Sequence, residues 1–541
     1  MQWQQLYSPL GSAGASTLVA AIPIGVLLGC IASGKVKAHV AALLALGTAF
    51  LIATTIVGMP IGAATSATLF GAAFGLFPIC WIVLNILFLY QLTAEQGAFE
   101  RMKESIASLS EDRCIQLVLI AFAVGSFFEG TAGFGTPVAI TGALLIGLGF
   151  TPLQASGLSL IANTAPVAFG AMGTPVLALQ GVTGIDALTL SKMIGRQLPI
   201  FSVIVPFWLI AVYEGWRGVR RVWPVLLVAG VSFAVPQFVM SNYHGPTLVD
   251  VVSSVICIVS VTLFVRFAPR AVGLGSPTRA PRAPRDESAS SRDAWAPWLI
   301  LCVLVFVWGL PQSKAWLNHL YAPQVHVPGL DGLVFRVPPV VATPTPEAAV
   351  FSFNILSATG TAILFAALIG GLFLRYSFGG MMRVYGRTML VAWRSLLTIT
   401  AMLAIGYLTR YSGLDAILGL AFARTGVLYP IFGTLLGWLG VALTGSDTAS
   451  NVLFGSLQKI TATQLGLSPI LMSAANSSGG VMGKMIDAQS IVVASTATKT
   501  SGNEGAILRF VFKHSIALAL LVGVLVYLQA YVAPFTRMVP H

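Results

Sequence analysis

The chain has 541 residues, of which 56% are hydrophobic and only 9% are charged, and its mean hydropathy is +0.86. An ordinary soluble domain carries about 25% charged residues, so the composition excludes a soluble globular protein. The formal net charge of +12 would suit nucleic-acid binding if it covered one face of a soluble domain. Here the basic residues gather in short loops between apolar stretches, so we expect a lipid bilayer as partner and no nucleic acid.

Apolar stretches long enough to cross a membrane recur from Ser16 to Val532. A crossing needs about 20 apolar residues, and on this criterion we count roughly 12 to 14. We therefore predict an all-α polytopic membrane protein. Residues 1–8 lack the basic region of a cleavable signal peptide. The five cysteines lie in or beside apolar stretches, which indicates small hydrophobic residues rather than a disulfide framework or a metal site.

The placement of Lys and Arg predicts the orientation, because cytoplasmic loops carry an excess of both. The pattern places the N-terminus, the loop 311–349 and the C-terminus outside. The loops expected inside carry these basic residues: Lys35, Lys37, Arg101, Lys103, Arg113, Arg217, Arg220, Arg221, those from Arg266 to Arg292, Arg375, Arg383 and Arg387. Arg410 and Arg424 fit less well, since the count puts them near the outer face; they either break the bias or are functional.

A linker divides the chain near its middle. Residues 267–294 are rich in Pro, Arg and Ser and have almost no large apolar residues, which is typical of flexible segments. The prediction is an N-terminal membrane half (1–266), this cytoplasmic linker, and a C-terminal membrane half (295–541) that includes the outer loop at 311–349.

Each half contains one acidic residue in a glycine-rich break of an apolar stretch. Glu129 lies in Gly125-Ser-Phe-Phe-Glu-Gly-Thr-Ala-Gly-Phe-Gly-Thr-Pro137, and Asp447 lies in Leu443-Thr-Gly-Ser-Asp-Thr-Ala-Ser-Asn451. A charge at the bilayer centre costs about 2.5–3.5 kcal/mol on insertion scales. Two such residues beside backbone that cannot be regular helix indicate that a polar or charged solute is handled inside the membrane.

The two halves also carry matching motifs in the same order, which predicts an internal repeat. The first motifs are Gly130-Thr-Ala, Gly149-Phe-Thr-Pro152, Gly170-Ala-Met-Gly173 and Arg196, and their counterparts are Gly445-Ser-Asp, Gly466-Leu-Ser-Pro469, Gly480-Val-Met-Gly483 and Arg509. By the charge pattern the first copy enters its break from the cytoplasm and the second from outside. That is an inverted repeat with broken or re-entrant helices at the midplane, the architecture of many secondary transporters.

Broken helices of this kind direct half-helix N-termini at an anion. The expected breaks are 129–137, 163–175, 444–451 and 476–487, and neutral polar side chains are frequent in them. The candidate substrate-binding residues are Thr131, Asn163, Thr164, Ser446, Asn451, Asn476, Ser477, Lys484 and Arg196. The alternative is that small residues allow helix packing and that hydroxyls bond back to the backbone.

The charged candidates have structural alternatives as well. Glu129 and Asp447 are the candidates for proton coupling, since burial allows a carboxyl to load and release a proton near neutral pH. Either could instead cap a half-helix and stay ionised, and this reading suits Asp447 better than Glu129. Lys484 could pair with Asp487 three residues on, and Arg196 could be an interface anchor.

Several long motifs resemble the bacterial lactate permease family, which includes lactate and glycolate permeases. They are Phe128-Glu-Gly-Thr-Ala-Gly-Phe-Gly-Thr-Pro-Val-Ala-Ile-Thr141, Asn163-Thr-Ala-Pro-Val-Ala-Phe-Gly-Ala-Met-Gly173, Gly195-Arg-Gln-Leu-Pro199, Ser357-Ala-Thr-Gly-Thr-Ala-Ile-Leu-Phe-Ala-Ala367, Gly437-Trp-Leu-Gly440 and Leu443-Thr-Gly-Ser-Asp447. The resemblance implies a transporter, not an enzyme, in the bacterial cytoplasmic membrane. It implies import of L-lactate, D-lactate and glycolate with protons, and no cofactor.

Other functions would need different features. A passive monocarboxylate channel would need a continuous polar lining or rings of like charge, whereas the chain has discrete polar breaks. A symporter coupled to Na⁺ is a further alternative. A membrane redox enzyme would need haem-ligating pairs or a dinucleotide motif, and of the six histidines only His514 is a plausible intramembrane residue.

Overall fold

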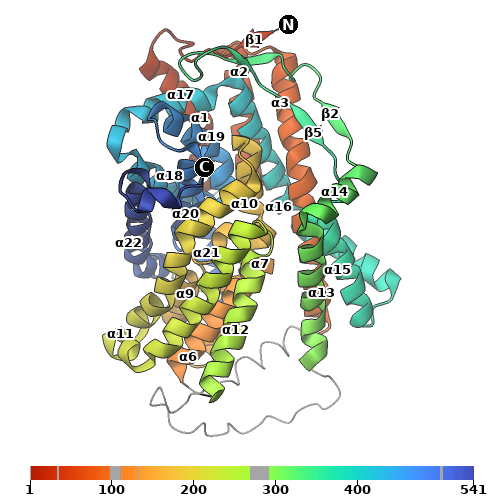
Figure 1. Ribbon diagram of the computed structural model, residues 1–541, viewed down its shortest axis with the longest axis vertical. Helices are drawn as coiled ribbons and strands as arrows, with labels where there is room; N and C mark the ends of the chain where they lie inside the picture. The colour runs from red at the N-terminus through yellow and green to blue at the C-terminus, as the bar shows by residue number, and fades with distance from the viewer. Residues whose placement is uncertain are drawn as a thin grey trace.

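A computed structural model describes residues 2–32, 36–97, 110, 112–131, 133, 135–267, 291–499 and 504–540. Helices dominate it, and they run along the long axis of the molecule (Figure 1). Eight described helices are long and apolar enough to cross a membrane, or up to ten if two bent pairs each count as one crossing. The prediction of an all-α polytopic membrane protein is confirmed.

The number of candidate crossing helices is lower than the predicted 12 to 14. Several continuous helical runs are longer than one crossing requires, and each of them is counted once. α11 (Ala187–Tyr243) has 57 residues and would be about 85 Å long if straight, far more than the roughly 30 Å hydrocarbon core. It is interrupted at Gly215, which has φ +72° and ψ −168°. Each arm is long enough for one crossing. Three shorter apolar helices contribute as well.

The first half begins with a group of helices that precedes the first repeat. Its members are α1 (Ala13–Ala32), α2 (Ala38–Thr55), α3 (Ile61–Phe74), η1 (Gly75–Cys80) and α4 (Trp81–Glu95). The first repeat follows as α6 (Arg113–Leu117), η2 (Val118–Val124), α7 (Gly125–Thr131), α8 (Thr136–Gly147), α9 (Pro152–Ala162), η3 (Val167–Phe169), α10 (Gly170–Thr183) and α11.

The second half has the same succession after a longer preamble. α12 (Val249–Phe267) closes the first half. The preamble of the second half is α13 (Ser291–Gly309), α14 (Pro311–Leu320), α15 (Thr359–Phe373), α16 (Phe378–Ser412), α17 (Leu414–Phe422) and η5 (Ala423–Leu428). The second repeat is α18 (Tyr429–Thr444), α19 (Asp447–Gln464), α20 (Pro469–Gly483), α21 (Ala488–Ala497) and α22 (Glu504–Tyr531), followed by η6 (Phe535–Met538). The predicted linker lies largely outside the described residues, and its last residues already belong to α13.

The outer loop folds into short strands at one end of the molecule (Figure 1). β1 (Trp3–Gln4) pairs in parallel with β3 (Val334–Arg336), which pairs antiparallel with β4 (Thr345–Pro346). β2 (Gln324–His326) and β5 (Val350–Ser352) form a separate antiparallel pair. The strand pairing places the N-terminus and the 311–349 loop on the same side, as the charge pattern predicts; Lys35 and Arg101 lie outside the described residues.

The repeats share a local structure at their second turn. Gly149 and Gly466 both adopt left-handed φ values, +83° and +68°, two residues after the last residues of α8 and α19. The next amides, of Phe150 and Leu467, each bond a carbonyl five residues back. Thr151 and Ser468 then cap α9 and α20 before a proline at the first helical position. This glycine–cap–proline sequence ends one helix and starts the next in the same way twice.

Contacts between the repeats are reciprocal. α8 packs on α21 while α19 packs on α10, and α9 packs on α22 while α20 packs on α11. If α8, α9, α10 and α11 correspond to α19, α20, α21 and α22, exchanging the two repeats turns each of these contacts into another one of the set. A two-fold relation produces this pattern. The α8–α9 turn lies beside Arg113 at the α6 end, whereas Gln464 at the end of α19 bonds Pro339 of the outer loop. In Figure 1 these are opposite ends of the long axis.

The proposed inverted repeat predicts opposite sidedness for these two turns. Leu153→Cys and Thr463→Cys both replace exposed side chains, and in a cysteine-free background a membrane-impermeant maleimide should label Thr463→Cys from outside and Leu153→Cys only after permeabilisation. Labelling of both from the same side would contradict an axis in the membrane plane.

Candidate functional site

Non-helical backbone interrupts the chain next to both acidic residues, although both breaks are shorter than the predicted 129–137 and 444–451, since Glu129 still belongs to α7 and Asp447 already belongs to α19. α7 ends at Thr131 and α8 begins at Thr136, with Gly133 and Gly135 at φ +57° and +83° between them. α18 ends at Thr444, and Gly445 at φ +73° separates it from α19. A left-handed turn is accessible to glycine without steric cost, so the glycines of both motifs allow the breaks.

The third predicted break is present and the fourth is shorter than predicted. Within 163–175, Ala171, Met172 and Gly173 have φ values of +43°, +58° and +76°. Non-glycine residues rarely adopt this region, and they cluster at functional sites. By contrast α20 continues through Asn476 to Gly483, so only residues 484–487 form the break. Gly479 and Gly483 of α20 lie against the backbone of α18, and this close packing of small residues keeps α20 regular.

The breaks surround one small cavity of about 60 Å³. Both candidate acids, Glu129 and Asp447, line it together with Lys484. It is also lined by the first residues of half-helices from both repeats: Gly133 before α8, Thr174 and Pro175 of α10, Ser446 and Thr448 at α19, and Gln489 of α21. The volume is small beside the roughly 300–1,000 Å³ of drug-sized pockets, so the cavity suits a solute of a few heavy atoms.

Glu129 lies on the last turn of α7 with a side chain that is 5% exposed. Its Oε2 accepts a hydrogen bond of 3.0 Å from Nδ2 of Asn163. Gly170 faces it so closely that a Cβ on this glycine would lie 2.7 Å from Oε1 of Glu129. Asn163 therefore reaches the site through Glu129, and Gly170 leaves room for the carboxyl group.

Asp447 has a corresponding environment in the second repeat. Its Oδ2 accepts hydrogen bonds from Ser477 and from Asn451, the latter at 3.3 Å. Gly480, the sequence counterpart of Gly170, lies against Oδ1. The N-cap of α19 is Ser446, whose hydroxyl accepts from the amide of Ala449, and Asp447 is the first helical residue. Capping is therefore not the role of Asp447, and its side chain faces the cavity.

Lys484 joins the two breaks of the second repeat. Its Nζ donates a 2.6 Å hydrogen bond to the carbonyl of Gly445 and lies 3.4 Å from the carboxylate of Asp487. Asp487 caps α21 by accepting from the amide of Ser490. The alternative of an ion pair with Asp487 is thus present, and Lys484 lines the cavity as well.

Of the nine predicted binding residues only Ser446 and Lys484 line the cavity. Asn163, Asn451 and Ser477 reach it through their hydrogen bonds to the two acids, and the other four lie outside the lining. The hydroxyl of Thr131 donates to a carbonyl of its own helix and that of Thr164 to a carbonyl at the end of the preceding α9, as the structural alternative described. Asn476 donates to Asn451 and so supports the site indirectly. Arg196 bonds Asn242 and the carbonyl of Met538, which is an anchoring arrangement.

Sequence reasoning missed the cavity residues Thr174 and Gln489, and it missed Asp250. Thr174 follows Gly173 as Lys484 follows Gly483, and this correspondence could have found it. Asp250 in the first turn of α12 is 1% exposed, and neither carboxyl oxygen has a hydrogen-bond partner among the described residues. It packs against Gly130, next to Glu129. An acidic residue at the start of an apolar stretch was the sequence feature that could have identified Asp250 as a candidate.

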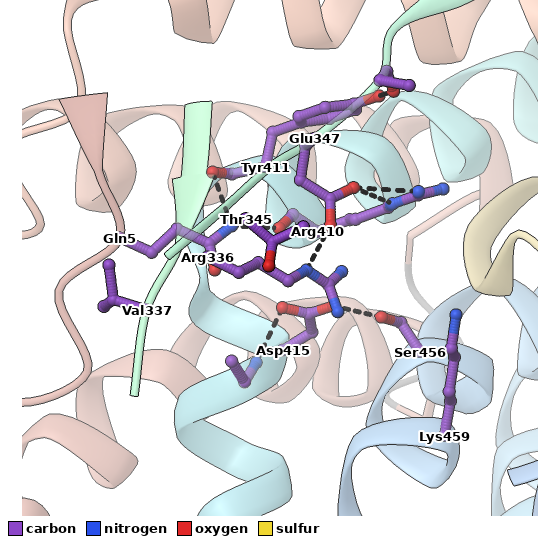
Figure 2. Close-up of polar contacts among 12 residues, drawn as sticks. Gln5, Arg336, Val337, Thr345, Glu347, Arg410, Tyr411, Asp415, Ser456 and Lys459 are labelled. Carbon is purple, nitrogen blue, oxygen red and sulfur yellow. Dashed lines mark hydrogen bonds and ion pairs between the residues drawn. The ribbon is translucent and has the colours of Figure 1, made fainter. Parts of the chain in front are cut away.

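A second cluster of buried charges lies between the outer loop and the helices (Figure 2). We call it the outer charge network; its members are Arg336, Glu347, Arg410, Asp415, Ser456 and Lys459. Glu347 pairs with Arg336 and, at 2.9 Å, with Arg410, and Ser456 donates to Asp415. Burial alone would raise the pKa of Glu347, but the charges of Arg410 and Arg336 hold it below its usual range.

The outer charge network holds the C-terminal end of α10, one of the site helices. Arg410 donates to the carbonyl of Gly181 at 3.2 Å, and Lys459 donates to that of Thr183 at 2.6 Å. Both carbonyls end α10, while Lys459 belongs to α19. Cations at a helix C-terminus are favourable. Arg410, which fitted the charge pattern poorly, is therefore a structural residue neutralised by Glu347.

Comparison with known proteins identifies the family. The family model described as L-lactate permease matches residues 16–533. The chain belongs to the L-lactate permease family. It is 46% identical to the glycolate permease GlcA of Escherichia coli K12, with 99% of both chains covered. It is 43% identical to the L-lactate permease of Salmonella typhimurium (99% of this chain, 100% of the relative) and 41% identical to that of Bacillus subtilis (100% of both).

The resemblance drawn from the motifs is thus confirmed, and a permease is a transporter rather than an enzyme. Among solved structures, an Alcanivorax borkumensis YdaH transporter aligns with a TM-score of 0.43 and 16% identity, covering 85% of this chain and 87% of that chain. Similarity at this level does not establish a shared fold.

Removing the cation of the site should destabilise the protein. Lys484→Met leaves Asp487 buried without its partner, and breaking a buried pair costs about 3–5 kcal/mol. The double variant Lys484→Met/Asp487→Asn should recover part of this loss, because Asn removes the charge and still caps α21. Unfolding in detergent measures the stability of both variants. Equal stability of the single variant and the wild type would contradict a structural role for the Lys484–Asp487 pair.

The outer charge network predicts a defined pH dependence. A carboxyl whose folded pKa is lowered stabilises the protein above its unfolded pKa, near 4.3 for Glu, and loses this contribution as the pH falls through the folded value. Glu347→Gln should therefore be less stable than the wild type at pH 7, and the difference should shrink below about pH 4. Thermal unfolding at a series of pH values measures it, and a difference that stays constant down to pH 3 would contradict the pairing.

Proposed function

We propose that this protein imports lactate, glycolate and related short 2-hydroxy monocarboxylates across the bacterial cytoplasmic membrane by proton symport. The observation that carries the proposal is the cavity that Glu129, Asp447 and Lys484 line between the broken helices of both repeats. Its size suits a small solute, and its membrane-spanning surroundings suit a transporter. The names of the relatives, lactate and glycolate permeases, give the substrate class.

The helix starts around the cavity supply the chemistry for a carboxylate. Free amide groups and the dipole at a helix N-terminus favour an anion, and α10, α19 and α21 all begin at this cavity. The ammonium of Lys484 adds a positive charge. Thr174 and Gln489 offer neutral hydrogen-bonding groups that can read the substrate hydroxyl. A monocarboxylate with a 2-hydroxyl matches this combination of donors.

Two acids beside one cation give the cavity a means of coupling substrate binding to proton binding. With an anionic substrate bound, a proton on Glu129 or Asp447 reduces the excess of negative charge in a low-dielectric site. Substrate and proton then stabilise each other's binding, which is the condition for symport. Glu129 is the proposed carrier, with Asp447 as its counterpart in the second repeat. Alternating access would follow from motion of the two repeats around the fixed cavity, with both chain termini outside.

Coupling through Glu129 predicts a separation of two activities. Glu129→Gln keeps the hydrogen bonding with Asn163 but cannot release a proton. In proteoliposomes it should lose uphill uptake of labelled L-lactate under an imposed pH gradient, while exchange of lactate at equilibrium survives because no net proton moves.

Asp250→Asn provides the matched comparison, since Asp250 is a neighbouring buried acid that does not line the cavity. Loss of uphill uptake in Asp250→Asn with retention in Glu129→Gln would transfer the role to Asp250. Uptake driven by a Na⁺ gradient alone would favour Na⁺ coupling, and lactate flux that dissipates but never concentrates would favour a channel.

A further inference from the structure

A second and much larger pocket lies away from the central cavity, where α15 ends and α16 begins. It has a volume of about 610 Å³. Three of its lining residues are arginines, Arg375, Arg383 and Arg387, and Tyr376 and Gln96 also line it. Arg383 and Arg387 lie one turn apart on α16, so their side chains extend from the same face.

The positive charge of this pocket exceeds what its neighbours neutralise. Arg387 pairs with Glu95 at 3.0 Å, and both side chains are substantially exposed, 64% and 34%. Among the described residues, Arg375 and Arg383 have no ion pair. Among the described side chains, three guanidinium groups face one carboxylate, which leaves the lining net positive. Guanidinium groups bind phosphate oxygens in a planar, bidentate geometry.

Exposed apolar side chains flank the arginines on both helices. Leu372 and Phe373 at the end of α15 are each 63% exposed, and Phe378 and Met382 at the start of α16 are 67% and 42% exposed. In a membrane protein such residues contact acyl chains while neighbouring arginines extend to the headgroup region. The pocket therefore combines a site for a phosphate with a surface for hydrocarbon.

We propose that the Arg375–Arg383–Arg387 pocket binds the phosphate headgroup of an anionic phospholipid. Basic pockets between membrane helices on the cytoplasmic side bind such headgroups, and the Lys and Arg pattern predicts this side for these residues. A free phosphate ion would use the same arginines, but it would leave the apolar flank without a partner. This site is independent of the transported substrate.

The test uses the purified full-length protein in a neutral detergent. Thermal unfolding is followed while phosphatidylglycerol, phosphatidylcholine or inorganic phosphate is added. Phosphatidylglycerol should raise the Tm of the wild type by about 3 °C or more, since a ligand that binds the folded state stabilises it. The other two additions should raise it much less.

The arginine variants assign the effect to the pocket. In Arg375→Asn/Arg383→Gln/Arg387→Gln the shift with phosphatidylglycerol should disappear; Asn is chosen at 375 because it tolerates the φ of +62° found there. The charge-matched control is Arg217→Gln/Arg220→Gln/Arg266→Gln, which removes three exposed arginines elsewhere and should retain the shift. Glu95→Gln, which frees Arg387, should retain or enlarge it.

Three results would overturn the proposal. An equal loss in the control variant would mean that overall charge, not this pocket, attracts the lipid. An equal shift with phosphatidylcholine would mean that the acyl chains suffice. An equal shift with inorganic phosphate would make the pocket a site for a free anion.

Discussion

The hydrogen bond from Lys484 to the carbonyl of Gly445 is the contact on which the candidate site depends. In hydrocarbon an unsatisfied carbonyl costs several kcal/mol, so helices break within a membrane only where protein groups satisfy the freed backbone. One ammonium group does this for the α18–α19 break and also pairs with Asp487 at the α20–α21 break. Because a single side chain serves both breaks, the two half-helix starts are held at one cavity.

The two repeats build similar environments for their acids but do not build identical halves. Glu129 has Asn163 and Gly170, and Asp447 has Ser477 and Gly480; the two glycines occupy corresponding places in the motifs, whereas Ser477 corresponds to Thr164 and not to Asn163. The residue that follows the Gly-x-Met-Gly motif differs, however: it is Thr174 in the first repeat and Lys484 in the second. Among the residues that the structure describes, two acids and one cation therefore line the cavity, and under the proposed function this imbalance would let a proton and an anionic solute favour each other's binding.

The sequence predicts the breaks well because their cause is local. The breaks lie at glycines that adopt left-handed φ values, such as Gly133, Gly135 and Gly445, and an acid in an apolar stretch is visible without a structure. Asn476 shows the limit: its polar neighbours suggested irregular backbone, but packing of glycines against α18 keeps the helix intact. The outer charge network joins Arg336 and Glu347 of the loop to Arg410 and Asp415 of distant helices. Such pairings depend on tertiary contacts that no local pattern contains.

The location of bound substrate tests the account most directly. An experimental structure of the protein with L-lactate or glycolate should show the carboxylate beside Lys484 and the start of α19, between Glu129 and Asp447. The same preparation of Lys484→Met provides the comparison, since density there should weaken or vanish. Substrate density in the wild type at a place that contacts neither acid nor either break would contradict the account.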